Sequence, residues 1–451
     1  MIPAAPVLLR RCSLVIWCAL WGLASCHELD PYLDRCRRIR PDRYVVVLPH
    51  ERVRSPAVQR FVARKEGEGF RVELLTFTPS RDRDRCAREL RPRLAALRPP
   101  PGRHAYVLFV ATHRELPMGP WQLDGGSEAV RSDVPYLLDG APSPLPTRVW
   151  RRAFEPGFPW VLGRVPYSSE SVLDKALNSG TRLARPRGTP LVLVGGERFA
   201  VWWDTSLVMS SARARFVEAG WRTVSYANDW PCDVELGLDA PDSIHAAHGV
   251  ATARANRRRG DGVPPLAIPM ALLDRVKDPE AKLFLTHWQY LAPDVVYLNS
   301  HGTSASVGSY LLPIDSWLRR GRDGRSRTPP ERPAVLVNIA CSGGVPNSPL
   351  LLYLFAHDFI CAAVGSTVAT APLPLGAAIR AEVDVASLIA AELPLGVGLR
   401  AARESYFADA RTSLWYWVIP SMAATVGQNL LGMTLYGDPS LQMPYLQRGD
   451  R

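Results

Sequence analysis

Closely spaced cysteine pairs of the kind that bind zinc are absent from this sequence. Its 8 cysteines are scattered along 451 residues. His245 and His248 could share one face of a helix, but no cysteine or third histidine lies near them in the sequence. We therefore expect no metal site and no cofactor, with calcium the one ion that the sequence leaves open.

Acidic residues are absent from the chain before Glu28, where a basic pair precedes an apolar run from Cys12 to Ala24. This run has 13 residues, fewer than the about 20 that a membrane-spanning helix needs. A short apolar run behind basic residues is typical of an export signal. The run ends in Leu23-Ala24-Ser25-Cys26, which resembles the lipobox of bacterial lipoproteins.

This resemblance implies that residues 1–25 are removed as a lipoprotein signal peptide and that Cys26 carries the lipid. Residues 26–41 would then link the anchor to the folded part. The expected location is the bacterial membrane, facing the periplasm or the cell surface. An ordinary cleaved signal remains the alternative. Outside the cytoplasm Cys36 and Cys86 could form a disulfide, although spacing alone cannot assign pairs.

Positive charge exceeds negative charge, with 54 Lys and Arg against 43 Asp and Glu. The clearest basic clusters, 257–259 and 319–327, lie among Gly, Asp, Ser and Pro residues, as solvated loops do. The charge is otherwise spread along the chain. We therefore expect no nucleic-acid partner, and we interpret the excess as surface electrostatics.

Strand-like and helix-like stretches alternate from Tyr44 onward, which predicts an α/β fold with a mostly parallel sheet flanked by helices. The connector Arg185 to Pro190 is rich in Pro, Gly and Arg and marks a subdomain boundary. The expected strands are 44–49, 69–75, 105–111, 191–195, 222–226, 294–299, 334–340 and 360–367, and the expected helices are 56–66, 82–97, 168–184, 210–219 and 377–393.

His301 and Cys341 each follow an apolar run with the composition of a buried strand. Alone, such a cysteine is usually a small core residue and such a histidine a capped strand end. Together at the carboxyl edge of one parallel sheet, they would form a cysteine nucleophile with its general acid/base. The backbone amides of Gly302 and Cys341 are the expected oxyanion donors.

The pairs His301-Gly302 and Ala340-Cys341 resemble the histidine-glycine and alanine-cysteine motifs of the caspase-like cysteine peptidases. Within that group the sequence is most similar to the gingipain family. The likeness covers most of residues 42–445. Its other short motifs occur in the family's order: Tyr44 to Pro49, Gly69 to Leu75, Ser132-Asp133 with Tyr136, Leu162-Gly163-Arg164, and Leu435 to Leu441 with its Gly437-Asp438-Pro439.

The resemblance implies two caspase-like three-layer α/β/α subdomains, 42–187 and 188–446, of which the second is catalytic. It implies a cysteine endopeptidase that acts on protein or peptide substrates, with a preference for basic residues. A transpeptidase with the same dyad and a catalytically silent membrane-anchored scaffold remain alternatives. The sequence does not fix the oligomeric state, nor does it rank Asp133, Glu197 and Asp315 as a third, orienting carboxylate.

Overall fold

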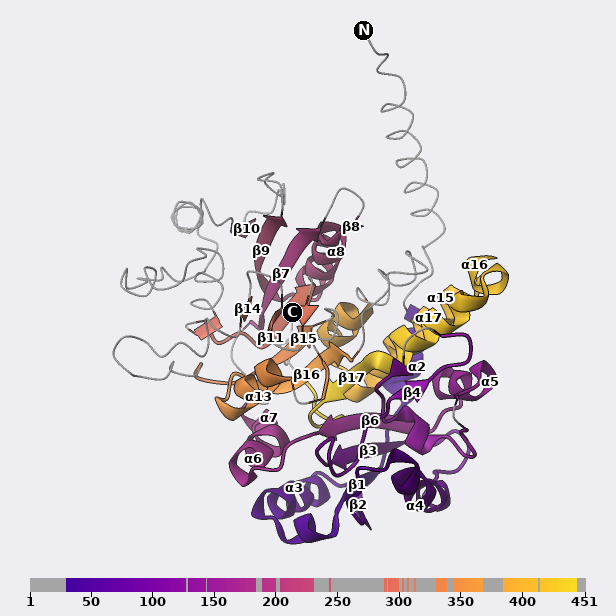
Figure 1. Ribbon diagram of the computed structural model, residues 1–451. Coiled ribbons are helices and arrows are strands. Elements are labelled where there is room, and N and C mark those ends of the chain that lie inside the picture. The colour runs from indigo at the N-terminus through magenta and orange to yellow at the C-terminus, as the bar shows by residue number, and fades with distance from the viewer. Residues whose placement is uncertain are drawn as a thin grey trace.

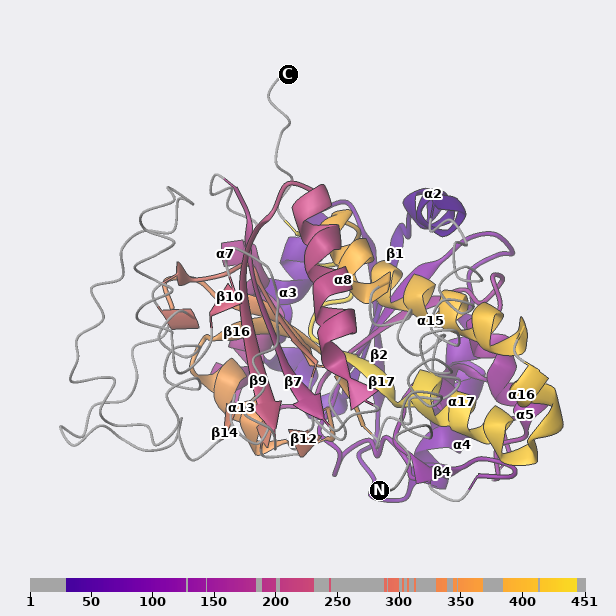
Figure 2. The same ribbon diagram turned by 90° about the horizontal axis from the view of Figure 1, so that it is seen from above.

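The computed structural model describes residues 30–126, 129–142, 144–183, 189–199, 203–230, 243–244, 288–289, 291–299, 302–303, 306–307, 312–313, 330–338, 344–346, 348–367, 384–412 and 414–443. These residues build one large, mostly parallel sheet with helices on both faces (Figures 1 and 2). The predicted α/β class with three layers is confirmed.

The sheet has 12 strands, in the order β10-β9-β7-β11-β15-β16-β17-β6-β3-β1-β2, with β8 paired to β7. The first half of the chain supplies β1 (Arg43–Pro49), β2 (Arg71–Phe77), β3 (Ala105–Val110) and β6 (Trp160–Val165). The second half supplies β7 (Leu191–Phe199), β8 (Trp203–Asp204), β9 (Arg222–Trp230), β10 (Ser243–Ile244), β11 (Val295–Asn299), β15 (Ala334–Asn338) and β16 (Ile360–Ser366).

The two halves meet at β17 (Met433–Tyr436), the last of the described strands in the chain. This strand is antiparallel to β16 and parallel to β6. Strands of the first half therefore run opposite to those of the second, and the two parallel halves form one continuous sheet rather than two separate ones.

Helices cover both faces of each half. Strand β1 illustrates this in the first half, because its successive side chains point to opposite faces of the sheet. Tyr44 and Val46 join the core that α3 (Pro56–Gly67) and α6 (Glu170–Asn178) cover, whereas Val45 joins the core under α4 (Arg83–Ala96). In the second half, α8 (Thr205–Glu218) and α13 (Pro349–Ala356) lie on opposite faces (Figure 2).

Five further described helices lie along the first half: α2 (Asp30–Arg38), α5 (Thr147–Trp150), α15 (Leu395–Thr412), α16 (Leu414–Val418) and α17 (Pro420–Gly432). The short helix α7 (Gly180–Leu183) contacts α6 and β16. The described residues also form two small antiparallel sheets. One pairs β4 (Trp121–Gln122) with β5 (Ala129–Val130), and the other has three strands, β12 (Gly302–Thr303), β13 (Ser306–Val307) and β14 (Leu312–Pro313). Within the described ranges no helix is both long and apolar enough to cross a membrane.

Local sequence explains where the helices begin. Ser55 caps α3 by accepting a hydrogen bond from the Val58 amide, and Pro56 occupies its first turn, where no amide is needed. Asp82 caps α4 in the same way through the Arg85 amide. The predicted helices 56–66 and 82–97 are therefore confirmed to within one residue, while the predicted helix 168–184 divides into α6 and α7.

The disulfide considered for Cys36 and Cys86 is absent. Both are free and buried, and they belong to separate hydrophobic cores. Spacing along the chain could not show that the sheet keeps them apart.

Candidate active site at the carboxyl edge of β11 and β15

Strands β11 and β15 lie side by side, as the sequence predicts for the two strands that precede the histidine and the cysteine. They are parallel and in register, with Leu298 opposite Asn338, and every residue of both is buried. Their carboxyl ends therefore meet at one edge of the sheet. In open α/β sheets this is the edge at which ligands bind.

His301 and Cys341 themselves lie outside the described residues. Their positions in the chain nevertheless relate simply to the paired strands, since His301 follows Leu298 by three residues and Cys341 follows Asn338 by three. The two strands that precede the candidates thus lie side by side, with Leu298 and Asn338 at the same level of the sheet. Cys26, the proposed lipid site, also lies outside the described residues.

The nearest described residues before and after Cys341 lie against the same residue of β16. Asn338 pairs with Gly365 of β16 where β15 ends. Six positions later Gly344 packs against that same glycine, because a Cβ added to Gly344 would lie 2.6 Å from the Gly365 carbonyl carbon. Asn338 and Gly344, the described residues that flank 339–343 in the sequence, therefore both lie against Gly365, and Cys341 belongs to the undescribed residues between them.

Gly302, one of the two expected oxyanion donors, begins β12 and pairs with Val307 of β13. Only two residues separate the end of β11 at Asn299 from this hairpin. His301 therefore lies in the sequence directly between two described strands, β11 and β12.

Buried polar residues end the three central strands, and sequence reasoning did not single them out. Asn299 ends β11, Asn338 ends β15 and Ser366 ends β16, and none is more than 5% exposed. A polar side chain at the end of an otherwise apolar strand is the signal that could have identified them. They make this edge of the sheet polar.

The three candidates for an orienting carboxylate differ in position. Asp133 is 2% exposed, and its carboxylate accepts a hydrogen bond from the buried guanidinium of Arg164, which makes it part of the framework. Glu197 lies in β7, one residue beyond the position that pairs with Asn299 at the same edge. Asp315 lies outside the described residues.

Side-chain contacts hold Gly344 and the residue just beyond β16. The Tyr436 hydroxyl donates a hydrogen bond to the Gly344 carbonyl and lies 3.8 Å from the sulfur of Met118. Just beyond β16, the Thr367 hydroxyl donates to the Arg131 carbonyl at 2.6 Å. Tyr436 therefore contacts Gly344 directly, whereas the first half of the chain contacts Tyr436 through Met118 and the end of β16 through Arg131.

The short motifs behind the family resemblance contact one another in this framework. Arg164 of β6 pairs with Asp133 and also donates to three backbone carbonyls. A Cβ on Gly163 would lie 2.6 Å from the Gly437 carbonyl oxygen, and the Gly437 amide donates to the Arg164 carbonyl at 2.8 Å. Gly437 itself has φ +119°, which favours glycine. These contacts place the motifs at the junction between the halves and beside it.

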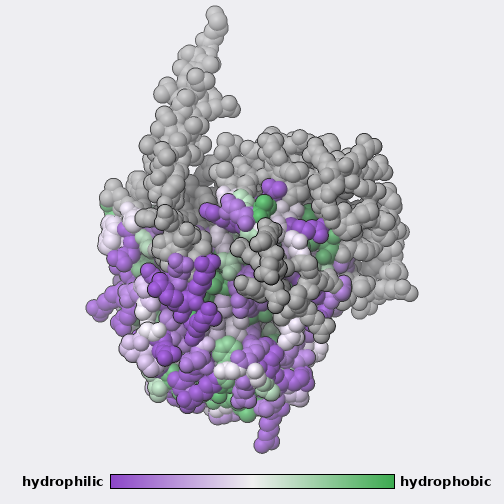
Figure 3. All heavy atoms as spheres, turned by 180° about the vertical axis from the view of Figure 1, so that it is seen from behind, coloured by the Kyte–Doolittle hydropathy of each residue, from purple (hydrophilic) through white to green (hydrophobic). Residues whose placement is uncertain are grey.

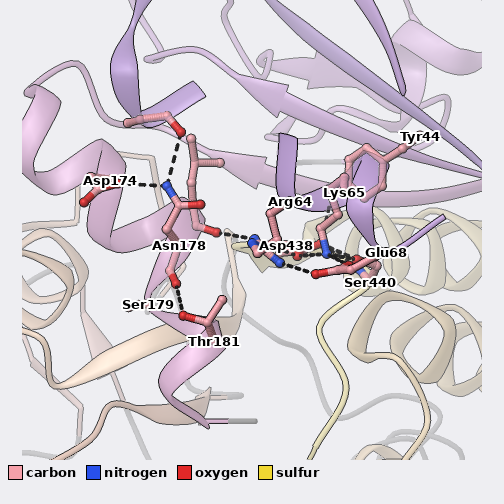
Figure 4. Close-up of polar contacts among 12 residues, drawn as sticks. Tyr44, Arg64, Lys65, Glu68, Asp174, Asn178, Ser179, Thr181, Asp438 and Ser440 are labelled. Carbon is pink, nitrogen blue, oxygen red and sulfur yellow. Dashed lines mark hydrogen bonds and ion pairs between the residues drawn. The ribbon is translucent and has the colours of Figure 1, made fainter. Parts of the chain in front are cut away.

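Asp438 is the centre of a buried polar cluster that ties the chain after β17 to α3 (Figure 4). Its carboxylate accepts hydrogen bonds from Tyr44 at 2.8 Å and from Ser440, and it pairs with Lys65 at 2.7 Å. Burial by itself would raise the pKa of Asp438, but the charges of Lys65 and Arg64 and these hydrogen bonds outweigh it and lower the pKa. The carboxylate is therefore a charged anchor.

The described cysteines are poor nucleophiles. Burial raises the pKa of the Cys36 and Cys361 thiols to about 12 and that of Cys86 to about 11. All three stay protonated at neutral pH, whereas attack requires the thiolate. Among the described parts of the chain, no group of three or more side chains could hold a metal ion.

Polar and charged residues cover most of the described surface in the view of Figure 3, and apolar residues are scattered among them. This agrees with the spread of charge along the sequence. The terminal aromatic cluster divides between core and surface, since Tyr416 is 3% exposed and Trp417 is 61% exposed.

No model of a protein family matches the chain, and no curated protein matches its sequence. Solved structures match it by fold. The crystal structure of the Arg-specific cysteine proteinase gingipain R (RgpB) aligns with a TM-score of 0.54 at 13% identity, over 90% of this chain and 80% of that one. The complex of Porphyromonas gingivalis RgpB pro- and mature domains gives 0.52 at 14% identity, over 89% and 79%.

A third solved structure, described as a protease, gives a TM-score of 0.55 at 11% identity over 90% of this chain and 79% of that one. All three likenesses span both halves of the sheet. The chain has the fold of the gingipain cysteine proteinases.

Proposed function

We propose that this protein is a cysteine endopeptidase in which Cys341 is the nucleophile and His301 the general acid/base. One observation carries the proposal: the two residues follow adjacent, parallel strands by the same number of positions, from the paired residues Leu298 and Asn338. The gingipain fold supports the same assignment. The described cysteines offer no competing nucleophile, because burial keeps each of them as a thiol.

The chemistry follows from this pair. The Cys341 thiolate attacks the scissile carbonyl, and a sulfur–carbon bond forms while the amides of Gly302 and Cys341 hold the oxyanion. His301 gives a proton to the leaving amine as the carbon–nitrogen bond breaks. Water then attacks the acyl-enzyme, which releases the carboxylic acid and restores the thiol. No cofactor takes part in this scheme.

The proposal extends to substrate and location. Gingipain R is described as Arg-specific, and we propose that this chain also prefers to cleave after basic residues. The apolar run at its start and the Leu23-Ala24-Ser25-Cys26 sequence support export and lipid attachment at Cys26. The enzyme would then act on peptides at the outer side of a bacterial membrane.

The test is labelling of the purified protein with thiol-directed peptidyl probes that carry Arg, Lys, an acidic or an apolar residue. We expect the basic probes to label Cys341, no labelling in Cys341→Ala, and slower labelling in His301→Ala. Cys361→Ala is the matched control, since its thiol lies 2% exposed in the core, and it should label like the original protein. Absence of labelling by every probe would refute the peptidase and favour a scaffold.

The location needs a separate measurement. Cys26→Ala should move the protein from the detergent phase to the aqueous phase in a phase-partition assay of bacterial membranes, because the lipid could no longer attach. An unchanged partition would refute lipid attachment and leave the peptidase assignment intact.

A further inference from the structure

Two exposed apolar side chains lie next to each other in α16. Trp417 is 61% exposed and Val418 is 62% exposed, which makes them the most exposed large apolar side chains among the described residues. Figures 1 and 2 place α16 at the outer end of α15, at the edge of the molecule. Exposed apolar residues scattered singly are ordinary on a protein surface, whereas two neighbours at a protruding point indicate a contact surface.

The residues around this pair hold it in its exposed position. Tyr416 is 3% exposed and belongs to the same hydrophobic core as Phe407 of α15. The Trp417 indole donates a hydrogen bond from Nε1 to the Arg411 carbonyl at 2.9 Å. Because the tyrosine occupies the core side of this short helix, Trp417 and Val418 are left on its outer side.

Arginines surround this aromatic end of the helix. The guanidinium of Arg151, the residue after α5, lies 5.2 Å from the centre of the Tyr416 ring and 5.9 Å from that of Trp417. The Arg411 guanidinium lies 5.5 Å from the centre of the Phe407 ring. Within the described parts of the chain neither arginine forms an ion pair with a carboxylate, so both positive charges are available to an anionic partner.

We propose that Trp417, Val418, Arg151 and Arg411, which we name the tip patch, contact a lipid bilayer that carries anionic phospholipids. Tryptophan is enriched where proteins meet lipid headgroups, because its ring is apolar and its N–H is polar. Arginine beside it is attracted to the lipid phosphates. The inference goes beyond the proposed function, since this contact requires neither the peptidase nor a lipid on Cys26.

The size of the tip patch favours a bilayer over a protein partner. A stable protein–protein interface buries about 1,200 Å² or more around an apolar centre, and two exposed apolar side chains are too few for such a centre. The same two side chains are enough to enter the headgroup region of a membrane, where the arginines add electrostatic attraction.

The first test concerns the apolar side chains. The full chain, carrying Cys26→Ala so that no attached lipid contributes, is sedimented with vesicles of phosphatidylcholine mixed with phosphatidylglycerol. We expect Trp417→Ser to weaken binding about tenfold and Val418→Ser about threefold, because binding scales with the apolar surface that enters the bilayer. Val217→Ser is the matched control, since Val217 is 48% exposed on α8, outside the tip patch, and it should bind like the original chain.

The second test concerns the charge. The double variant Arg151→Gln, Arg411→Gln should bind the mixed vesicles about tenfold more weakly or worse, because each basic residue near an anionic surface contributes about fivefold. The original chain should bind vesicles of phosphatidylcholine alone only weakly. The matched control is Arg54→Gln, Arg81→Gln, which removes the same charge from two exposed arginines outside the tip patch and should leave binding unchanged.

Other outcomes decide against the proposal. Equal binding by Trp417→Ser and the original chain, equal losses in the control variants, or binding that is the same without phosphatidylglycerol would overturn it. So would dimers of the original chain that Trp417→Ser abolishes while vesicle binding stays unchanged, since the tip patch would then join two copies of the protein. Urea denaturation midpoints equal to that of the original chain would show that the variants remain folded, and peptide cleavage in solution should be unchanged in all of them.

Discussion

The Lys65–Asp438 pair allows a quantitative prediction about the junction between the two halves. The Lys65 ammonium is 2% exposed and lies 2.7 Å from Asp438 and 2.6 Å from Glu68. Replacement of one partner in a buried pair costs about 3–5 kcal/mol, because the other charge stays buried without its counterion. We expect Lys65→Met to lower the free energy of unfolding by that amount, measured by urea denaturation with tryptophan fluorescence.

Arg60→Met is the matched control on the same helix. Arg60 is 58% exposed and pairs with Asp174 at 2.8 Å, and exposed pairs contribute at most about 1 kcal/mol. The double variant Lys65→Met, Asp438→Asn should lose less free energy of unfolding than the two single variants lose in sum. The loss from Lys65→Met should also shrink at acid pH, because the lowered pKa of Asp438 stabilises the fold only while the carboxylate is charged. A loss below about 1 kcal/mol at neutral pH would refute the reasoning.

Three further predictions follow from single contacts. Gly163→Ala should destabilise the protein by about 1–3 kcal/mol, because the added methyl group would clash with Gly437. Gly157→Ala is the control, because a Cβ there meets nothing within 4 Å, and it should leave the denaturation midpoint unchanged. Equal denaturation midpoints for the two variants would contradict the clash. Burial lowers the pKa of His113 to about 4, so the stability that the neutral imidazole contributes is complete above about pH 6.5 and disappears as the pH falls toward 4. A denaturation midpoint that stays constant over this pH range in the original protein, or that falls equally in His113→Gln, would contradict this prediction. Cys361 should resist a disulfide reagent at pH 7.5 until the protein unfolds, and rapid reaction of the folded protein would disprove its burial.

The sequence was informative where a structural element depends on its own residues. The apolar stretches 295–299 and 334–338 are strands because every side chain in them is buried, and their composition predicts this directly. The caps Ser55 and Asp82 likewise mark the helix starts that the structure shows. That these two strands are neighbours was predicted from the chemistry expected of His301 and Cys341, which follow them in the sequence.

The sequence was uninformative where contacts join distant residues. Tyr436 and Gly344 are 92 positions apart and Tyr44 and Asp438 are 394 apart, and no local pattern links either pair. The four residues of β17 are too few to reveal that this strand joins the halves, so two separate sheets were the natural expectation. Non-local pairing of this kind depends on packing across the whole chain.

The place of β17 has a consequence for the order in which the protein can fold. It comes after every other described strand in the chain but lies in the interior of the sheet, between β16 and β6. Until residues 433–436 arrive, both of those strands are open edges of the kind on which other chains can pair and aggregate. The same arrival brings Tyr436 to Gly344. A chain still being synthesised therefore keeps β6 and β16 unpaired on this side, and synthesis of the closing strand joins the two halves of the sheet and brings the Tyr436 hydroxyl to Gly344 in one step.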